Sequence, residues 1–397
     1  MKGRVLIVHA LFDALGGGEI FVLRLAQALI DEGFQVDVLT STPVDSAKIR
    51  EIYGESELPS FIVRRVREAE AMIRLMPGRL VRLRRLLVYR RYRSFLEESR
   101  LKYDLVIDTQ SNLPTPVDIS YIHFPVLLPT RSGGLLWSIY NGLVKLIASS
   151  YKTPRSGRVL ANSTWTAYMV YRVYGIIPDV LYPPVDIDYF REASMNSNRE
   201  KIIVTISRFS PEKKLEKILD VASELPDYTF VIVGSTGLGS EKIVEDLKER
   251  IDKLRLRNVE LKPNLPRSQL RELLSKALFY LHPEFTEHFG IAVVEAMSAG
   301  CIPIVYRDGG AWHDAVAKVS EKLGYSNIGD VPKIIRQIEK EKQLQEELRK
   351  KSIEVSKTFS YDNFKKNLAE KVYYILKIKK LSWLRLMTPD TYLWDRL

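Results

Sequence analysis

Short apolar runs alternate along this chain with longer stretches of helical period, a pattern typical of parallel strands connected by helices. The first apolar run is Val5 to Val8, and a helical pattern over residues 20–30 leads to a second strand at residues 35–40. The turn between the first strand and the helix contains Gly16, Gly17 and Gly18. A βαβ unit with a glycine-rich turn usually opens a doubly wound parallel sheet, so we expect an α/β fold.

The same alternation continues into the second half and indicates two domains. Further strands are expected at residues 103–108, 119–125, 201–207, 230–235 and 278–281. A length of 397 residues is sufficient for two ordinary domains. Pro183 and Pro184 are stiff and extended, as a linker should be. We therefore assign residues 1–185 to a first domain, 186–360 to a second, and 361–397 to a C-terminal helical segment.

One stretch in the second domain combines acidic residues with a helix start. A polar loop ends at Gly290, a helical pattern runs from Ile291 to Ala299, and a β-rich run follows. Glu287 lies just before this helix and Glu295 lies inside it, so both carboxylates can border one pocket and grip vicinal hydroxyls. Glycine permits close approach of a ligand, and the amides of the first helical turn favour an anion such as diphosphate. The alternative is that both glutamates are solvated charges.

Two basic residues follow an earlier strand of the same domain. Arg208 and Lys213 lie in the loop between the strand at residues 201–207 and the next helix. If they converge, they neutralise a diphosphate and stabilise it as a leaving group. Taken alone, they are ordinary surface charges. Gly234 ends another strand of this domain, and we include it among the candidate residues of the same binding site.

The positive charge of the chain is concentrated in one segment. Of the formal charge of +11, a net +9 lies between residues 64 and 93, where eleven arginines oppose two glutamates. Leucine and methionine alternate with the arginines, which predicts a basic amphipathic helix in an insert over about residues 64–96. The residues that gather on one side are Arg79, Arg82, Arg90 and Arg93, and we expect them to lie on anionic lipid headgroups. A solvated face is the alternative.

Cysteine content and hydropathy bear on the compartment. Cys301 is the only cysteine, which excludes an intramolecular disulfide, and it lies in an apolar run. No uninterrupted apolar stretch reaches the length of a membrane span, and Met1 to Val8 reads as a strand rather than a signal peptide. We therefore expect a cytoplasmic protein that associates peripherally with the cytoplasmic face of a membrane.

The acidic stretch resembles a known family signature. Glu287 and Glu295, which enclose Phe289 and Gly290 and precede Pro303, are similar to the E-x7-E signature of retaining glycosyltransferases of family 4 with the GT-B fold. The resemblance implies two Rossmann-like domains that face each other across a cleft, with a C-terminal helix crossing back to the first. It also implies that Glu295 holds the ribose hydroxyls of a nucleotide sugar, that Glu287 lies by the donor sugar, and that the backbone of Phe289, Gly290 and Ile291 meets sugar and diphosphate.

Other motifs extend the resemblance over nearly the whole chain. Arg208 and Lys213 match the family's G-R-L-x-x-x-K-G element, although Ser207 and Lys214 replace its two glycines. The turn from Gly16 to Gly18, followed by glutamate, resembles the family loop that faces the donor diphosphate. Tyr-Ile-His-Phe-Pro around His123 resembles a stretch of the lipid-linked-oligosaccharide α-1,2-mannosyltransferases. In that relationship, His123 touches the donor sugar or the acceptor hydroxyl.

These features together predict a retaining glycosyltransferase that moves a sugar, with mannose as the best choice, from GDP-mannose or a UDP-sugar to a lipid-linked or other glycan acceptor. We expect neither a metal nor another cofactor, because the pair His282 and His288 has no third ligand at suitable spacing. Two other classes remain open: a related sugar-nucleotide epimerase or pyridoxal-phosphate phosphorylase, and a basic nucleic-acid-binding protein. The sequence contains no nucleic-acid-binding motif, so we expect no such partner. It leaves the linkage and the oligomeric state open.

Overall fold

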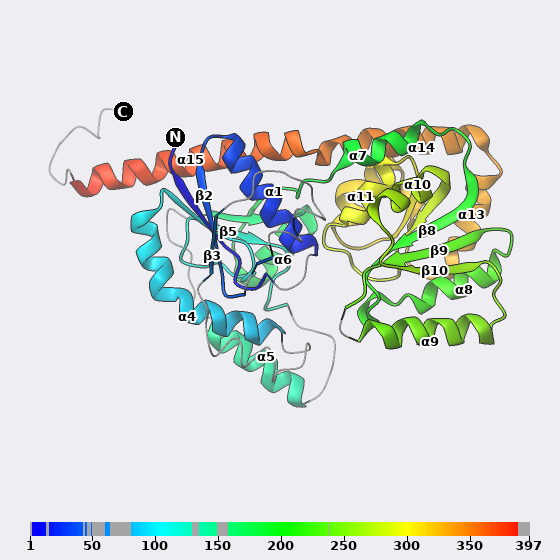
Figure 1. The fold of residues 1–397 in the computed structure, drawn as a ribbon, viewed down its shortest axis with the longest axis horizontal. Coiled ribbons are helices and arrows are strands. Elements are labelled where there is room, and N and C mark those ends of the chain that lie inside the picture. Colours follow the sequence, from blue (N-terminus) through cyan, green and yellow to red (C-terminus); the bar gives the residue numbers. More distant parts are fainter. Residues whose placement is uncertain are drawn as a thin grey trace. The chain divides into compact units, whose positions relative to one another are not determined.

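The chain folds into two compact units, each built on a parallel sheet (Figure 1). The computed structural model describes residues 2–12, 16–42, 44–45, 49, 60–63, 81–128, 135–148, 158–237 and 239–387. The first unit comprises residues 1–162, 166–181 and 364–397, and the second comprises residues 163–165 and 182–363. Residues 163–165 and 182–185, which the sequence analysis places in the first domain, thus belong to the second unit.

The sheet of the first unit has the strand order β3-β2-β1-β4-β5-β6-β7, and its neighbouring strands are parallel. The strands are β1 (Arg4–Val8), β2 (Gln35–Thr40), β3 (Ser60–Val63), β4 (Leu105–Asp108), β5 (Ile119–Ile122), β6 (Arg158–Ala161) and β7 (Asp179–Val180). Both faces of the central strands are covered, which explains their continuous apolar runs.

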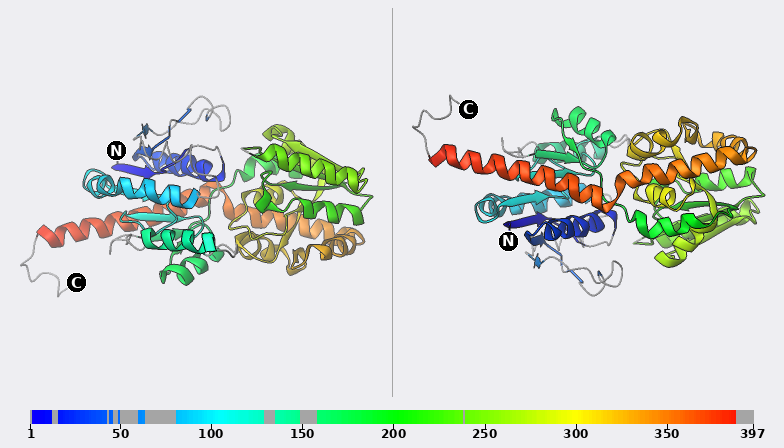
Figure 2. Two further views of the ribbon diagram at one scale, coloured as in Figure 1. Left: turned by 90° about the horizontal axis from the view of Figure 1, so that it is seen from below. Right: turned by 90° about the horizontal axis from the view of Figure 1, so that it is seen from above.

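Helices lie on both faces of this sheet (Figure 2). On one face, Phe21 of α1 (Gly17–Asp31) stacks on Tyr121 of β5, and Phe364 of α15 (Tyr361–Met387) contacts Phe21. On the other face, Tyr89 of α4 (Val81–Lys102) reaches Asp108 of β4. The described part of the unit also contains α5 (Leu135–Ala148), which packs on α4, and α6 (Thr164–Tyr174), whose first two residues belong to the second unit.

The sheet of the second unit has the order β10-β9-β8-β11-β12-β13 and is also parallel. Its strands are β8 (Glu200–Ile206), β9 (Thr229–Gly234), β10 (Val259–Pro263), β11 (Ala277–Leu281), β12 (Ile302–Tyr306) and β13 (Gly324–Tyr325). Its helices are α7 (Ile187–Arg191), α8 (Glu216–Glu224), α9 (Ser240–Lys253), α10 (Arg267–Lys276), α11 (Ile291–Ser298), α12 (Ala317–Val319), α13 (Val331–Glu339) and α14 (Lys342–Ser356), with short helical turns between them. A single large core of buried residues runs through the unit.

Strand order fixes where each unit can hold a ligand. In both sheets the first and fourth strands are neighbours, β1 beside β4 and β8 beside β11, and the order reverses between them. The loops that follow such a pair diverge at the carboxyl edge and leave room for a ligand. In the second unit these loops are residues 207–215 and 282–290, and in the first unit they begin at His9 and Thr109.

The doubly wound α/β arrangement is therefore confirmed, with two local differences. The helix predicted over residues 20–30 begins earlier, at Gly17, because the Glu19 carboxylate accepts a hydrogen bond from the Gly16 N–H at 3.1 Å and caps the first turn. Gly17 and Gly18 are consequently helical, and Gly16 is the residue of the turn. In the basic insert, α4 covers residues 81–102, whereas residues 64–80 lie outside the described residues.

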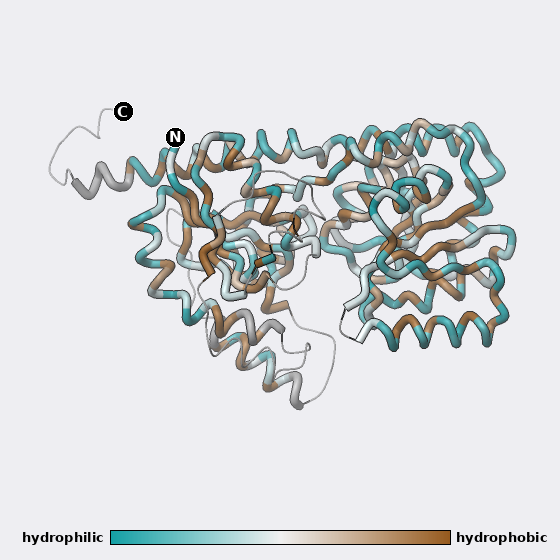
Figure 3. Tube along the Cα trace, in the orientation of Figure 1, coloured by the Kyte–Doolittle hydropathy of each residue, from teal (hydrophilic) through white to brown (hydrophobic). Residues whose placement is uncertain are grey.

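Hydropathy along the chain follows this architecture (Figure 3). Most strands of both sheets are apolar, and the helices alternate between apolar and polar residues. Within the described ranges, no helix combines the length and the apolar character that crossing a bilayer would require. The same part of the chain contains no cluster of acidic, histidine or cysteine side chains suited to a metal ion.

Candidate functional site

The loop between β11 and α11 is held in place through its backbone. Glu287 forms an isolated parallel bridge with Gly309, and the Ala311 N–H donates to the Glu287 carbonyl at 3.4 Å. Gly309 has φ +94°, and a Cβ there would lie 2.2 Å from the Glu287 carbonyl oxygen. Only glycine allows this approach. The turn after β12 therefore fixes the position of Glu287.

Asp308 holds the side chains on either side of Glu287. Its carboxylate accepts hydrogen bonds from Thr286 Oγ1 at 2.6 Å and from Trp165 Nε1 at 2.8 Å. The Trp165 ring in turn stacks on His288, with 5.5 Å between the ring centroids. This explains why residues 163–165 belong to the second unit. The loop is thus braced by a segment more than a hundred residues away in the chain.

The Glu287 carboxylate faces two nitrogen-bearing side chains. Lys213 Nζ lies 3.2 Å and His282 Nε2 lies 3.5 Å from Glu287 Oε2. The Lys213 ammonium also lies over the Phe285 ring, 3.8 Å from its centroid. His282 Nδ1 is 2.9 Å from the Pro283 carbonyl, which can only accept, so Nδ1 carries a proton. Nε2 is directed at Glu287, and a hydrogen bond to the ionised carboxylate requires a proton on Nε2 as well.

These neighbours keep Glu287 ionised. Burial alone raises the pKa of Glu287, but the hydrogen bond with His282 and the positive charge of Lys213 outweigh burial and hold this pKa well below its ordinary value. The carboxylate is therefore an acceptor of hydrogen bonds. With Lys213 beside it, the site presents one negative and one positive group at the edge of the sheet where β8 and β11 are neighbours.

The predicted pair of cations is only partly brought to Glu287. Lys213 ends a 3-10 turn (Pro211–Lys213) and is largely shielded, whereas Arg208 is exposed and its guanidinium lies 3.7 Å from Glu212 on the same loop. Lys214, which stands where the family has glycine, adopts the left-handed conformation with φ +49°. This backbone requirement explains the glycine of the family motif.

Glu295 meets a different environment on α11. Arg267 NH2 lies 3.6 Å from Glu295 Oε1 and 2.8 Å from Asp186 Oδ2. Burial raises the pKa of Glu295 to about 7, although Arg267 opposes the effect. Sequence analysis identifies Glu295 but neither Arg267 nor Asp186, which follow no motif spacing.

The start of α11 is shaped as the anion-binding hypothesis expects. Gly290 has φ +90°, and its carbonyl accepts from the amides of Val293 and Val294. The amides of Ile291 and Ala292 precede these first intrahelical bonds and point out of the helix end. The Phe289 side chain packs on Tyr182 and Phe359, so Phe289 can offer a ligand only its backbone.

Gly234 has a structural reason to be glycine. A Cβ at this position would lie 1.8 Å from the Ser207 carbonyl oxygen. The end of β9 therefore packs directly against the loop that carries Arg208 and Lys213. Gly234 positions this loop, and its contact with a donor stays a prediction.

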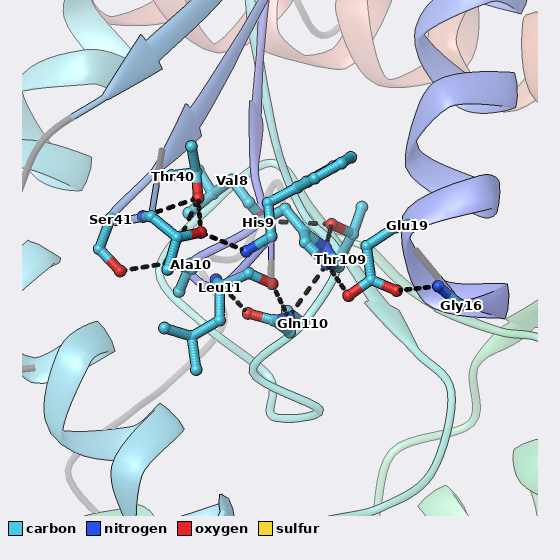
Figure 4. Close-up of polar contacts among 12 residues, drawn as sticks. Val8, His9, Ala10, Leu11, Gly16, Glu19, Thr40, Ser41, Thr109 and Gln110 are labelled. Atoms are coloured by element: carbon cyan, nitrogen blue, oxygen red, sulfur yellow. Dashed lines mark hydrogen bonds and ion pairs between the residues drawn. The ribbon is translucent and has the colours of Figure 1, made fainter. Parts of the chain in front are cut away.

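The first unit has a second polar cluster, which sequence analysis misses (Figure 4). His9, directly after β1, places Nδ1 2.9 Å from Thr109 Oγ1 and Nε2 3.0 Å from Gln110 Nε2. Gln110 is fixed by the Leu11 backbone, because its Oε1 accepts from the Leu11 N–H and its Nε2 donates to the Leu11 carbonyl. The Glu19 carboxylate that caps Gly16 lies 3.8 Å from His9 Nε2.

The hydrogen-bond directions in this cluster determine the form of His9. Thr109 donates its hydroxyl proton to the Val8 carbonyl at 3.1 Å, so it accepts from His9 Nδ1. Gln110 Nε2 can only donate, so His9 Nε2 accepts. His9 is thus a neutral imidazole with the proton on Nδ1. Its position after the first strand of a doubly wound sheet is the signal that could have identified it.

His123 lies at the carboxyl end of β5, as predicted. Its backbone N–H donates to Asn112 Oδ1 at 2.8 Å, and its ring contacts Phe21 and Tyr121 edge-on. The aromatic contacts hold the ring in the first unit. Its contact with donor or acceptor stays a prediction.

The predicted membrane-binding arginines are partly described. Arg90 and Arg93 are exposed on α4, and Arg93 Nε lies 3.3 Å from Glu97. Arg79 and the side chain of Arg82 lie outside the described residues. The neighbouring helix α5 exposes three apolar side chains at helical spacing, Ile139, Leu143 and Leu146. Sequence analysis does not single out this apolar row.

Two family models match the chain, one in each half. Residues 186–355 match the model described as Glycosyl transferases group 1, and residues 15–189 match Glycosyltransferase Family 4. The two matches together extend over most of the chain.

Curated relatives share one activity in their names, GDP-Man:Man(3)GlcNAc(2)-PP-Dol alpha-1,2-mannosyltransferase. The Dictyostelium discoideum protein is 27% identical over 59% of this chain and 50% of its own length. The Xenopus laevis protein is 31% identical over 41% of this chain and 37% of its own length, and the Homo sapiens protein is 29% identical over 40% and 35%. The matches thus span half or less of these relatives.

Solved structures show the same fold. Anabaena Alr3699/HepE in complex with UDP and glucose has a TM-score of 0.69 at 17% identity, covering 94% of this chain and 100% of that one. WaaG, a glycosyltransferase involved in lipopolysaccharide biosynthesis, has a TM-score of 0.67 at 16% identity, covering 93% and 99%. With the two parallel sheets, this likeness confirms the GT-B fold predicted from the sequence.

Proposed function

We propose, from the premise that this chain belongs to the family 4 and group 1 glycosyltransferases, that it transfers mannose from GDP-mannose to a hydroxyl of a lipid-linked oligosaccharide. The donor and the acceptor are the ones that appear in the names of its curated relatives. The epimerase, phosphorylase and nucleic-acid-binding alternatives have no comparable support, because the relatives compared above are transferases by name.

The observation that carries the proposal is the joint position of Glu287 and Lys213. Both side chains follow neighbouring strands at the point where the strand order reverses, and their charged atoms are 3.2 Å apart. The amides at the start of α11 lie directly after Glu287 in the chain. A nucleoside-diphosphate sugar offers a diphosphate to the lysine and the amides, and hydroxyls to the carboxylate.

This arrangement supports transfer with retention of the anomeric configuration. In the proposed step, the acceptor oxygen forms a bond to the anomeric carbon on the face from which the diphosphate leaves. The bond between this carbon and the phosphate oxygen breaks, and its electron pair stays on the phosphate. The acceptor's proton passes to that phosphate oxygen. Lys213 and the helix amides stabilise the developing negative charge, so the proposed step is routed through no metal.

Nucleotide release in the presence of a lipid-linked acceptor tests this proposal. We expect GDP release from GDP-mannose that depends on the acceptor, persists with a chelator and gives an α-linked product by NMR. Lys213→Met should reduce kcat by about a hundredfold, as when a charge-stabilising donor is lost from an active site. Lys214→Gly removes the neighbouring cation and should leave kcat unchanged.

Four results would contradict parts of the proposal. Faster turnover of a UDP-sugar than of GDP-mannose would show that the donor is the UDP-sugar. Conversion of the nucleotide sugar without acceptor would favour an epimerase, and an inverted anomer would exclude retention. Equal activity of Lys213→Met and the unaltered chain would remove the assigned role of Lys213.

We further propose that α4 and α5 place the first unit on an anionic membrane surface. The two helices pack together, since the Leu83 N–H donates to the Tyr140 hydroxyl at 3.3 Å. Exposed arginines of α4 and the apolar row of α5, which is Ile139, Leu143 and Leu146, supply the charge and the apolar surface that interfacial helices use. A peripheral position of this kind suits an acceptor carried on lipid.

Vesicle flotation tests the membrane proposal. The chain should float with phosphatidylglycerol-containing vesicles and much less with neutral ones. Replacing the three apolar residues of α5 with serine should abolish flotation, and Arg90→Gln with Arg93→Gln should weaken it in a salt-dependent way. Leu101→Ser is the matched control, because Leu101 is an isolated exposed leucine at the end of α4. Flotation unchanged by the α5 variant would contradict the proposal.

A further inference from the structure

Arg267 connects two acidic groups next to the start of α11. It is the first residue of α10, and its terminal nitrogen NH2 lies 2.8 Å from Asp186 Oδ2 and 3.6 Å from Glu295 Oε1. The same nitrogen thus lies between the two carboxylates. Asp186 precedes α7, so three separate elements converge here.

Two aromatic rings lie against the Arg267 guanidinium. Its central carbon lies 5.1 Å from the ring centroid of Tyr189 and 5.2 Å from that of Phe190. An arginine held by two rings and a carboxylate has little rotational freedom left. The direction from which it approaches Glu295 is therefore set by the fold of α7 and α10.

The ionisation of Glu295 depends on a positively charged neighbour such as Arg267. A carboxylate is an acceptor only when ionised, and burial favours its protonated form. Burial raises the pKa of Glu295 to about 7, Arg267 lowers it and Asp186 raises it. On β11, burial raises the pKa of Tyr280, and the charges of Glu287 and Glu295 raise it further. On α14, which packs on α11 as well, the buried Arg349 is directed at the Gly300 and Asn196 carbonyls.

We infer that Arg267 is a positioning residue of the donor site, which keeps the Glu295 carboxylate ionised and oriented to accept hydrogen bonds from the vicinal hydroxyls of a nucleoside diphosphate's ribose. The inference rests on the proposed function. Asp186 has two roles. Its ion pair anchors Arg267, and its own negative charge disfavours the ionised form of Glu295. The two residues therefore affect Glu295 in opposite directions.

The contribution of the ribose hydroxyls can be measured by comparing GDP with 2′,3′-dideoxy-GDP. Calorimetric titration of the full chain gives the ratio of the two dissociation constants, in which the titration of the phosphates cancels. For the unaltered chain we expect GDP to bind about tenfold more tightly at pH 8.5, as for one or two hydrogen bonds to a charged group. This preference should decline as the pH falls through 7 and Glu295 becomes protonated.

The midpoint is the pH at which half of the preference for GDP over 2′,3′-dideoxy-GDP is lost. Variants of Arg267 and of Asp186 should move this midpoint in opposite directions. Arg267→Gln removes the positive charge, so the ribose preference should appear only at higher pH. Arg267→Lys retains the charge and should keep the midpoint near that of the unaltered chain. Asp186→Asn removes a negative neighbour, so the midpoint should move to lower pH.

Arg271→Gln is the matched control. Arg271 lies one helical turn further along α10 and also lies over Tyr189, at 4.5 Å, but its carboxylate partner is Glu192. Its loss should change neither the ratio nor the midpoint. A merely structural role of Arg267 would weaken both ligands equally and leave the midpoint in place.

The outcomes separate the inference from the function on which it rests. If the unaltered chain binds both nucleotides but Arg267→Gln leaves ratio and midpoint unchanged, the inference is overturned and the donor assignment stands. If the unaltered chain binds no guanine or uracil nucleotide, the proposed function fails and the inference fails with it. Should Arg267→Gln not fold, the shift to lower pH expected for Asp186→Asn, together with the unchanged midpoint expected for Arg267→Lys, decides the question.

Discussion

Glu287 and Glu295 belong to one loop and helix, yet their carboxyl groups meet opposite surroundings. Glu287 is beside Lys213 and His282, which hold its pKa below the ordinary value of 4.5. Glu295 is buried with weaker compensation, and its pKa is raised to about 7. Two carboxylates with divergent environments are a mark of a functional site rather than of a solvated surface.

Replacing each glutamate with glutamine should change stability with opposite signs. A raised pKa means that ionised Glu295 disfavours the fold above pH 7, and this penalty vanishes below the unfolded value of 4.5. Glu295→Gln should therefore raise the free energy of unfolding at pH 8 by up to about 3 kcal/mol, with no gain at pH 4. The depressed pKa of Glu287 stabilises the fold above pH 4.5, so Glu287→Gln should be destabilising at pH 8.

Urea unfolding of the two variants at pH 8 and pH 4 measures these differences. The unaltered chain at each pH is the reference, because global charge effects are common to all three proteins. Shifts of the same sign at pH 8 would show that the two environments do not differ as described.

Lys214 has a backbone conformation that is unfavourable for a residue with a side chain. It adopts φ +49°, a region that costs a non-glycine residue about 1 kcal/mol or more. Lys214→Gly and Lys214→Ala remove the same charge, so their difference isolates the backbone. We expect the glycine variant to be more stable than the alanine variant by about 1 kcal/mol in chemical denaturation. Equal stabilities would indicate that the turn relaxes to another conformation.

At the scale of elements, α15 is attached to the first unit by a largely shielded ammonium group. Lys379 Nζ donates to the Asp104 carbonyl at 2.9 Å and to Asp118 Oδ2 at 3.0 Å. Asp118 is almost fully buried and receives the Val106 N–H and Arg100 as further partners. A helix late in the sequence thus completes the charge balance of a carboxylate between β4 and β5.

Lys379→Met should destabilise the first unit by about 2 kcal/mol, because Asp118 loses a charged partner while it stays buried. Hydrogen exchange of α15 and of the β4 strand should accelerate together. Lys380→Met is the control, since Lys380 is exposed on the same helix and should have little effect. Equal losses of stability in the two variants would show that Lys379 contributes only through the net charge of the protein.

Strands and helices could be predicted from the sequence where their burial produces a regular pattern of apolar residues. Strands covered on both faces give continuous apolar runs, so β1, β4 and β8 could be recognised from the sequence. The contact between Lys213 and Glu287 depends on the strand order, which the sequence analysis did not predict. His9 could not be recognised in this way, because a single histidine after a strand has no spacing to test. The contact between Asp308 and Trp165 joins residues 143 positions apart and leaves no local pattern. Arg267 is hidden for the same reason.

At the scale of the whole molecule, the chain passes more than once from one unit to the other. Three of the groups assigned to the donor site, Lys213, Glu287 and Glu295, lie in the second unit. Residues 163–165 also join this unit through Asp308 and Asp314, because the Asp314 carboxylate accepts from the Thr164 N–H at 3.0 Å and from the Tyr182 hydroxyl at 2.9 Å. A nucleotide bound in this unit should therefore also stabilise the start of α6.

Hydrogen exchange with and without GDP tests this coupling. A ligand that binds only the folded state stabilises it by about 2.7 kcal/mol at a hundredfold excess over its dissociation constant. Protection should increase in β8, β11 and α11, and also at the amides of Thr164 and Trp165. Asp314→Asn weakens the tie to Thr164, so protection at these two amides should fall while the strands keep theirs. Protection that appears only in residues 1–162 would instead place the nucleotide site in the first unit.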